Sequence, residues 1–261
     1  MCERIKAVGY DLVEVPVFEG DADHFRAVGA MLDAVGLART NCAIVPLPDA
    51  DPTSADDAVR QRGLAHLDWL VDCASALGSE SIGGPFHAPL GHFTGAGPTE
   101  EERARGIAAH RRMAAQLPDG MVLSLEALNR FETHFLNTMD DAFAYAEDVS
   151  HAAFKIMPDT FHMNIEERDP IAATAKIAAH TGVFHVSEND RGIPGRGHVD
   201  FVGHFRALKA GGWDGIVVIE AFGSALPELA AATRVWRPLF PDLETLITEA
   251  HDTIRQAWDK A

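Results

Sequence analysis

The stretch FKIMPDTFHMNIEERD, residues 154–169, joins a short apolar run to a dense cluster of polar side chains. The run Phe154–Met157 has the length and composition of a buried strand, and Asp159 follows it within two residues. A polar cluster at the exit of a strand is either a solvated turn or the rim of a site. The other apolar runs of the chain decide between these two interpretations.

Short apolar runs alternate with amphipathic stretches along the whole chain, which is typical of repeated βα units. Several of the runs are almost continuously apolar, as strands covered on both faces are. No linker interrupts the pattern, so we predict one domain, residues 1–261, with the (β/α)8 TIM barrel fold. The predicted strands are 11–17, 38–47, 79–86, 121–128, 154–158, 183–187 and 215–221, and the predicted helices are 23–35, 55–77, 99–116, 139–149, 170–180 and 201–210, with left-handed glycine caps expected at Gly36, Gly78, Gly182 and Gly211.

Only seven strands are found, whereas a closed barrel of this type has eight. The opening CERIKAVGYDLVEV, residues 2–15, fits the end of a helix that is capped at Gly9 and runs into a strand. The alternative is a continuous strand over residues 5–17, which would place Gly9 awkwardly inside it. We therefore predict that the first strand and most of the first helix of the barrel are lacking, which leaves an unpaired edge or a true start upstream of Met1.

The composition limits the function classes. The formal net charge of −17 argues against nucleic-acid binding, because phosphate contacts depend on Lys and Arg. No run of eighteen apolar residues and no signal-peptide core is found, so we predict a cytoplasmic protein without a membrane partner. The three cysteines are scattered and form no CxxC pair, which indicates reduced thiols.

Four predicted strands carry an acid or an imidazole within or just beyond their last residues. These residues are Glu126 in LSLEALN, Asp159 in KIMPDTF, His185 in VFHVSEN and Glu220 in VVIEAF, at intervals of 33, 26 and 35 residues. Each interval is about the length of one βα unit, so parallel strands would carry all four side chains to the same end of the barrel. Catalytic residues of TIM barrels lie at that end.

Three carboxylates at one buried mouth would repel one another strongly unless a cation were present. Oxygen ligands with a single imidazole suit hard divalent ions, whereas typical zinc and copper sites are rich in sulfur or histidine. We therefore predict one divalent metal ion at this site, which is Mn2+, Mg2+ or Co2+.

The motifs around these residues resemble those of the ketose 3-epimerases, a group within the xylose-isomerase-like barrels that includes the D-tagatose and D-allulose 3-epimerases. The similarity rests on LEALNRFETHFLNT, DTFHMNIEE, HVSENDRGIPGRGH, VIEAF and GGPFHAPLGHFTG, and it extends from about Arg4 to the C-terminal helix. It implies a sugar substrate, epimerisation of a free ketose at C3 through a cis-enediolate, and a homo-oligomer, dimeric or tetrameric.

The resemblance also implies a role for each residue. Glu126, Asp159, His185 and Glu220 would bind the metal, and Glu126 and Glu220 would exchange the C3 proton on opposite faces of the sugar. Further contacts to the substrate are implied for Glu132, His162 and Arg191. The remaining charge of the opening stretch is predicted to be solvated, with Glu166 and Glu167 as the acidic start of the next helix.

Three other functions remain open from the sequence. The same metal and enediolate chemistry serves aldose–ketose or hydroxypyruvate-type isomerases, which move the proton between C1 and C2. A metal-dependent DNA-repair endonuclease on a related barrel is disfavoured by the acidic charge. A non-catalytic sugar-binding or scaffold protein gains weight from the lacking first strand.

Overall fold

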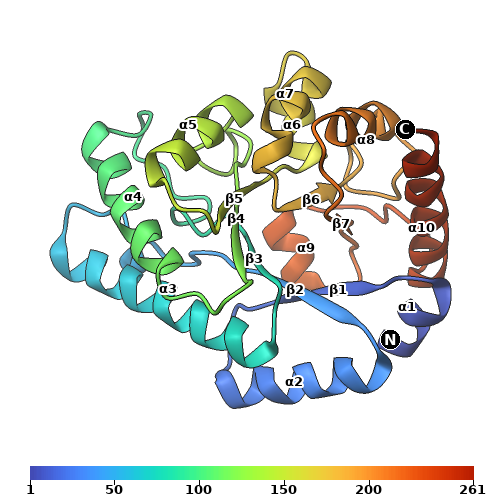
Figure 1. Ribbon diagram of the computed structural model, residues 1–261, viewed down its shortest axis with the longest axis horizontal. Coiled ribbons are helices and arrows are strands. Elements are labelled where there is room, and N and C mark those ends of the chain that lie inside the picture. Colours follow the sequence, from blue (N-terminus) through green and yellow to red (C-terminus); the bar gives the residue numbers. More distant parts are fainter.

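Seven short parallel strands form the centre of the protein (Figure 1). The computed structural model describes residues 1–261. Each strand lies within a range that the sequence predicts, and each is shorter than predicted. The strands are β1 (Leu12–Pro16), β2 (Ala38–Cys42), β3 (Ser81–Gly84), β4 (Val122–Glu126), β5 (Phe154–Met157), β6 (Val183–Val186) and β7 (Ile216–Ile219).

The strands are neighbours in the order in which they follow one another along the chain. β1 to β5 form one parallel sheet, and β6 and β7 form a parallel pair. Single bridges between Ile156 and Thr181 and between Asp159 and His185 connect the two groups. β1 and β7 stand at the two ends of this series and are not paired with each other. This strand order, with helices outside it, confirms the predicted TIM barrel class.

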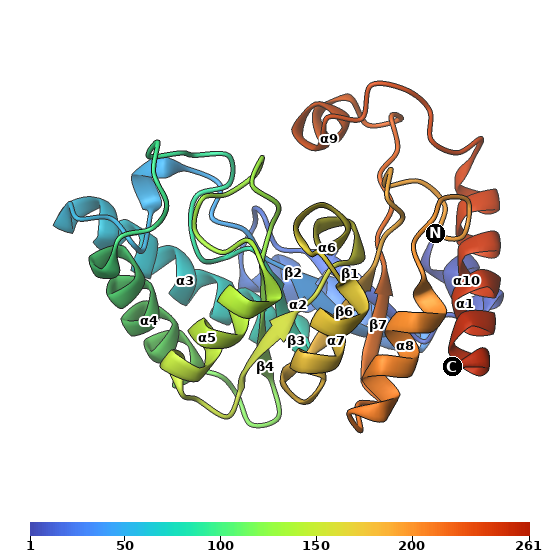
Figure 2. The same cartoon turned by 90° about the horizontal axis from the view of Figure 1, so that it is seen from above.

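Helices connect the strands and cover the outside of the barrel (Figures 1 and 2). On α3, for example, Leu67, Leu70 and Leu77 recur at helical spacing and are fully buried. Burial of each such side chain contributes about 1.5–3 kcal/mol relative to exposure. The helices are α1 (Cys2–Val8), α2 (Ala22–Val35), α3 (Asp57–Leu77), α4 (Glu100–Ala114), α5 (Met139–Val149), α6 (Thr160–Glu166), α7 (Pro170–Ile177), α8 (Phe201–Ala210), α9 (Pro227–Thr233) and α10 (Leu243–Lys260), with 3-10 turns η1 (Pro48–Ala50) and η2 (Ala178–His180).

Two of the four predicted glycine caps are confirmed. Gly36 and Gly78 end α2 and α3 with φ angles of 77° and 71°, in the left-handed region that favours glycine. Gly211 ends α8 with φ −80°, and Gly182 has no positive φ, so these two predictions are wrong. Gly182 is needed for a different reason: a Cβ there would overlap the Ser124 side chain, because the backbone passes close to the barrel interior.

The N-terminal segment is the predicted helix that runs into a strand. α1 ends at Gly9, whose φ of 119° allows its backbone N–H to reach the carbonyl oxygens of Ile5 and Lys6. A continuous strand from residue 5 is therefore ruled out. α1 lies beside α10, where Arg4 pairs with Glu244 (Figure 1).

The polar stretch after β5 is a helix in its own right, α6, which the sequence analysis missed. Asp159 is its N-cap, and Glu166 lies in its last turn. Glu166 accepts hydrogen bonds from the side chain of Arg130, and Glu167 accepts one from the Met139 backbone N–H at 2.7 Å. The prediction that Glu166 and Glu167 open the next helix is therefore wrong, because α7 begins at Pro170.

No helix of the chain is both long enough and apolar enough to cross a membrane. The helix α9 stands apart from the barrel wall, above the ends of the strands (Figure 2).

Candidate active site

The carboxyl ends of β4 to β7 bring together the four side chains that the sequence singles out as metal ligands. Glu126 is the last residue of β4, Asp159 lies two residues beyond β5, His185 lies in β6, and Glu220 directly follows β7. Ligand atoms of Asp159, His185 and Glu220 lie within 4.8 Å of one another. The same is true of Glu126, Asp159 and His162. The two groups share Asp159, so all four residues surround one site, and their role as metal ligands stays a prediction.

Burial and mutual repulsion shape the charges of the three carboxyl groups. Burial raises the pKa of Glu126 well above its usual value, and the charges of Glu220 and Asp159 raise it further. Burial also raises the pKa of Asp159, although Arg191 opposes this shift. For Glu220, burial alone would raise the pKa, but Arg191 and His185 outweigh it and lower the pKa to about 2. The site thus contains an acid that favours its proton and an acid that stays ionised.

Arg191 is the cation at the centre of this cluster. Its Nη1 donates to Asp159 Oδ2 at 2.6 Å, to Ser187 Oγ at 3.0 Å, and also to Glu220. Its guanidinium carbon lies 4.0 Å from the ring centroid of Phe161 and 5.0 Å from that of Phe222. Arg191 has φ 65°, a conformation that is uncommon outside glycine. Strained residues of this kind concentrate at functional sites.

His162 presents a ring N–H to the site, as its surroundings dictate. Burial and the charge of Arg191 lower its pKa to about 3, so the ring is neutral. The backbone N–H of Asn129 donates to Nδ1 at 3.0 Å, which places the single ring proton on Nε2. Nε2 lies 3.4 Å from Glu126 Oε1 and 3.0 Å from a nitrogen of Arg191. Because a guanidinium only donates, Glu126 Oε1 is the nearest acceptor towards which this proton can turn.

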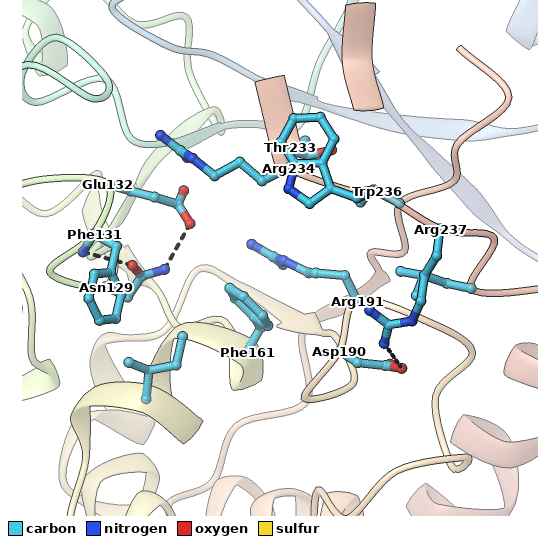
Figure 3. Close-up of a pocket in the computed structure, with 13 residues that line it drawn as sticks. Asn129, Phe131, Glu132, Phe161, Asp190, Arg191, Thr233, Arg234, Trp236 and Arg237 are labelled. Carbon is cyan, nitrogen blue, oxygen red and sulfur yellow. Dashed lines mark hydrogen bonds and ion pairs between the residues drawn. The ribbon is translucent and has the colours of Figure 1, made fainter. Parts of the chain in front are cut away.

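Beside these residues lies a cavity of about 370 Å³ (Figure 3). This volume is in the range of small-molecule sites. Glu132 lines the cavity and accepts a hydrogen bond from the Asn129 side chain at 2.8 Å. Arg191 and Phe161 reach the same space from the other side, below Trp236 of the segment after α9 (Figure 3). The three residues predicted to contact substrate are therefore all at or beside this cavity, and the contacts themselves stay a prediction.

Comparison with known proteins places this arrangement in a family. A family profile described as "Xylose isomerase-like TIM barrel" matches residues 2–254. The chain is 35% identical over 260 residues to the ketose 3-epimerase of Arthrobacter globiformis, with 97% of this chain and 88% of that protein covered. It is 34% identical over 251 residues to the L-ribulose 3-epimerase of Mesorhizobium japonicum, with 94% and 83% covered.

The chain belongs to the xylose isomerase-like TIM barrel family. Within it, the chain groups with the ketose 3-epimerases, as the resemblance of its motifs indicates, and it is an enzyme of the sugar isomerase and epimerase class. A solved structure of an L-ribulose 3-epimerase superimposes with a TM-score of 0.91 at 31% identity, covering 98% of this chain and 86% of that one. The D-allulose 3-epimerase from Methylomonas sp. in complex with D-allulose gives 0.90 at 30% identity, with 98% and 89% covered.

The residues of this family member fit a divalent metal ion. Asp159 and His185 are fully buried, Glu126 is nearly so, and neither ring nitrogen of His185 has a partner with good hydrogen-bond geometry. Three carboxylates and one guanidinium leave two negative charges uncompensated when all are ionised, and buried charges of this kind require a counter-ion. A hard dication meets this requirement with oxygen ligands and one imidazole.

Two further residues of the site were missed by the sequence analysis. Asn129, which stands inside the quoted motif LEALNRFETHFLNT, donates its backbone N–H to His162 and its side-chain amide to Glu132. Glu188 is fully buried and accepts from the backbone N–H groups of Asn189, Gly195, His198 and Val199 at 2.8–3.1 Å. It therefore organises the loop that carries Arg191. Its only signal in the sequence was an acid directly after the predicted strand 183–187.

Proposed function

We propose that this enzyme epimerises a free ketose at C3, with one divalent metal ion bound by Glu126, Asp159, His185 and Glu220. Mn2+ is the first candidate for the ion, with Mg2+ and Co2+ as alternatives. The observation that carries the proposal is the gathering of these four side chains at one end of the barrel in a chain 35% identical to a ketose 3-epimerase.

The chemistry requires the removal of a proton beside a carbonyl group, which is far too weak an acid for a free carboxylate. When bound, the metal ion supplies Lewis-acid stabilisation of the negative charge that develops on the carbonyl oxygen. Removal of the proton gives a planar cis-enediolate, which is open to protonation from either face. Inversion at C3 therefore needs one acid–base group on each face.

Glu126 and Glu220 are suited to this pair of roles. Without a metal ion, their surroundings shift their pKa values in opposite directions, up for Glu126 and down for Glu220, and a bound dication would favour the ionised form of both. In one direction Glu220 removes the proton and Glu126 returns one from the other face, and in the reverse direction the roles exchange. They also belong to different clusters around Asp159 and reach the site from β4 and β7, which supports their proposed roles on opposite faces of the sugar.

The hydrogen-bond donors near these acids are suited to charged oxygens of the substrate. The Nε2–H of His162 and the guanidinium of Arg191 both face the carboxyl groups, and charge-assisted bonds of this type strengthen as an oxygen gains negative charge. Glu132, held by Asn129, offers an acceptor for a sugar hydroxyl at the cavity wall.

An aldose–ketose or hydroxypyruvate-type isomerase would use the same residues, so the position of proton exchange is the decisive measurement. The protein is stripped with a chelator, reloaded with Mn2+, Mg2+ or Co2+, and incubated in D2O with a panel of ketopentoses and ketohexoses. NMR then locates the deuterium. Label at C3 with the epimeric product is expected, whereas label at C1 or C2 would replace the proposal by the isomerase.

Two variants test the residue assignment. Glu220→Gln removes one acid–base group at nearly constant shape, and we expect turnover to fall by at least about a hundred-fold, as for general acid–base catalysis. Glu101→Gln, at an exposed position of α4, makes the same chemical change far from the site and should leave turnover unchanged. Unchanged turnover in Glu220→Gln, or full activity after exhaustive chelation, would contradict the proposal.

The proposal includes the assembly and the location of the enzyme. A dimer or tetramer is expected in analytical ultracentrifugation, and cell fractionation is expected to recover the protein with the cytoplasm. Both expectations rest on the resemblance and the composition rather than on any contact described above.

A further inference from the structure

Glu14 is a largely buried acid that none of the roles above uses. It lies in β1, which is not a sheet neighbour of β6, yet its Oε1 lies 3.0 Å from Nε2 of His185. Its side chain is only 11% exposed. Its second oxygen, Oε2, accepts a hydrogen bond from Thr40 Oγ1 at 3.0 Å. Glu14 and Thr40 are direct register partners of β1 and β2, so the strand pairing itself holds the carboxylate in place.

This contact constrains the tautomer of His185. A neutral imidazole has one N–H, and an ionised carboxylate can only accept. The approach of Glu14 to Nε2 is the only one at hydrogen-bond distance, since the nearest group to Nδ1 is Glu220 Oε1 at 3.9 Å. The ring proton is therefore favoured on Nε2, although its direction departs from an ideal hydrogen bond. Nδ1 then turns its lone pair towards Glu220 and Asp159.

A carboxylate in a low-dielectric interior is costly unless it is paired, and Glu14 has only Thr40 and His185 to pair with. Histidines that bind metals commonly donate their other ring N–H to a carboxylate, which fixes the ring and raises its basicity. In the arrangement Thr40–Glu14–His185, the carboxylate likewise faces a ring nitrogen of a histidine, and it also accepts from the threonine hydroxyl. It also joins β1 and β2 at one end of the strand series to β6 near the other.

We propose that Glu14, supported by Thr40, is a positioning residue that holds His185 with the Nδ1 lone pair directed at the metal site. This rests on the proposed function, because it assumes that His185 is a ligand. Loss of Glu14 then weakens metal binding without removing any ligand atom.

The test uses the purified full chain and Mn2+ alone, with no sugar present. Glu14→Gln keeps the size of the side chain but offers an amide that can donate to Nε2, which would move the ring proton to Nδ1. Isothermal titration is expected to show a Kd for Mn2+ about ten- to a hundred-fold higher than in the parent protein, as for other partners of ligating histidines. Thr40→Val, which leaves Glu14 with one partner, should shift the Kd in the same direction by less.

A second measurement follows the ring directly. Long-range proton–nitrogen NMR of 15N-histidine-labelled protein, in the metal-free state and at a pH high enough to keep the ring neutral, distinguishes the two tautomers of His185. We expect the Nε2–H form in the parent protein and a shift towards Nδ1–H in Glu14→Gln. Glu19→Gln, an exposed acid of the same segment, is the matched control and should change neither readout.

The outcomes separate the two proposals. If the parent protein binds Mn2+ and Glu14→Gln binds it within two-fold as tightly, the role of Glu14 is overturned while the metal site stands. If Glu14→Gln does not fold, an unchanged Kd in Thr40→Val overturns it instead. If the parent protein binds none of Mn2+, Mg2+ and Co2+, the proposed function fails at its first step and the role of Glu14 falls with it.

Discussion

Glu188 offers a sharp test of how the Arg191 loop is held. Its Oε1 accepts from three backbone N–H groups, of residues 189, 198 and 199, and its Oε2 accepts from Gly195 N–H at 2.8 Å. In Glu188→Gln one oxygen becomes an NH2 group. The remaining oxygen can still accept from the three N–H groups, but the new amide nitrogen would face the N–H of Gly195, donor against donor.

The expected loss follows from that geometry. One charge-assisted hydrogen bond disappears and one buried N–H is left without a partner, which together cost about 2–3 kcal/mol. For a chain of this length such a loss lowers Tm by roughly 4–10 °C. Arg191 belongs to the same loop, so turnover should fall as well, even though Glu188 does not contact the cavity.

Urea unfolding followed by circular dichroism measures the loss of stability. The matched control is Glu249→Gln, which removes an exposed carboxylate that pairs with Arg196 of the same loop at 2.8 Å. An exposed pair of this kind contributes at most about 1 kcal/mol. If Glu188→Gln unfolds at the same urea concentration as Glu249→Gln, the loop does not depend on the buried carboxylate and the interpretation is wrong.

Three further perturbations test other parts of the structure. Gly182→Ala should destabilise the fold by about 1–3 kcal/mol, because the added Cβ would overlap Ser124 and lie 2.9 Å from Lys155 Cβ. The control is Gly97→Ala, where an added Cβ would meet nothing within 4 Å. Equal urea midpoints for the two variants would show that the close packing at Gly182 does not limit stability. Asn129→Ala keeps the backbone N–H that donates to His162 but removes the side-chain amide that contacts Glu132 and His162, and it should lower kcat about ten-fold; an unchanged kcat would show that neither residue needs this support. Burial lowers the pKa of His204 to about 4, so the unfolded chain binds its proton first and stability falls as pH drops from about 6.5. His204→Gln should reduce the pH dependence of the free energy of unfolding, measured by urea titration, by up to about 1.4 kcal/mol per pH unit, and identical slopes would contradict this.

The sequence was sufficient for the strands and for the convergence of their ends. Apolar runs spaced by about one βα unit indicate the barrel, because parallel strands joined by such connections all end at the same edge. Glu126, Asp159, His185 and Glu220 follow from that rule alone, and the structure brings them together. The helix-to-strand transition at Gly9 was predictable for a similar reason, since the left-handed cap is a local property of one residue.

Local patterns were insufficient where a contact over long range decides the structure. Gly182 resembles a helix cap by position, but its lack of a side chain is required by Ser124 on another strand. The acids at 166 and 167 resemble the opening of a helix, yet their partners are Arg130 and Met139, far back in the chain. Periodicity carries no information about such partners.

The charge balance of the site depends on supporting contacts that only the structure reveals. Arg191 compensates Asp159 and Glu220 only because its backbone adopts φ 65° and Glu188 ties down the loop around it. Each of these conditions is weak by itself, and an arginine in a loop is ordinarily a solvated residue. The role of Glu14 is also visible only in the structure. β1 and β6 are far apart in the strand order, and the Glu14 side chain reaches His185 across the barrel interior. Strands arranged around a common interior therefore add a set of cross-barrel pairs that sequence spacing cannot indicate, and the residues that support the predicted ligands are drawn from that set.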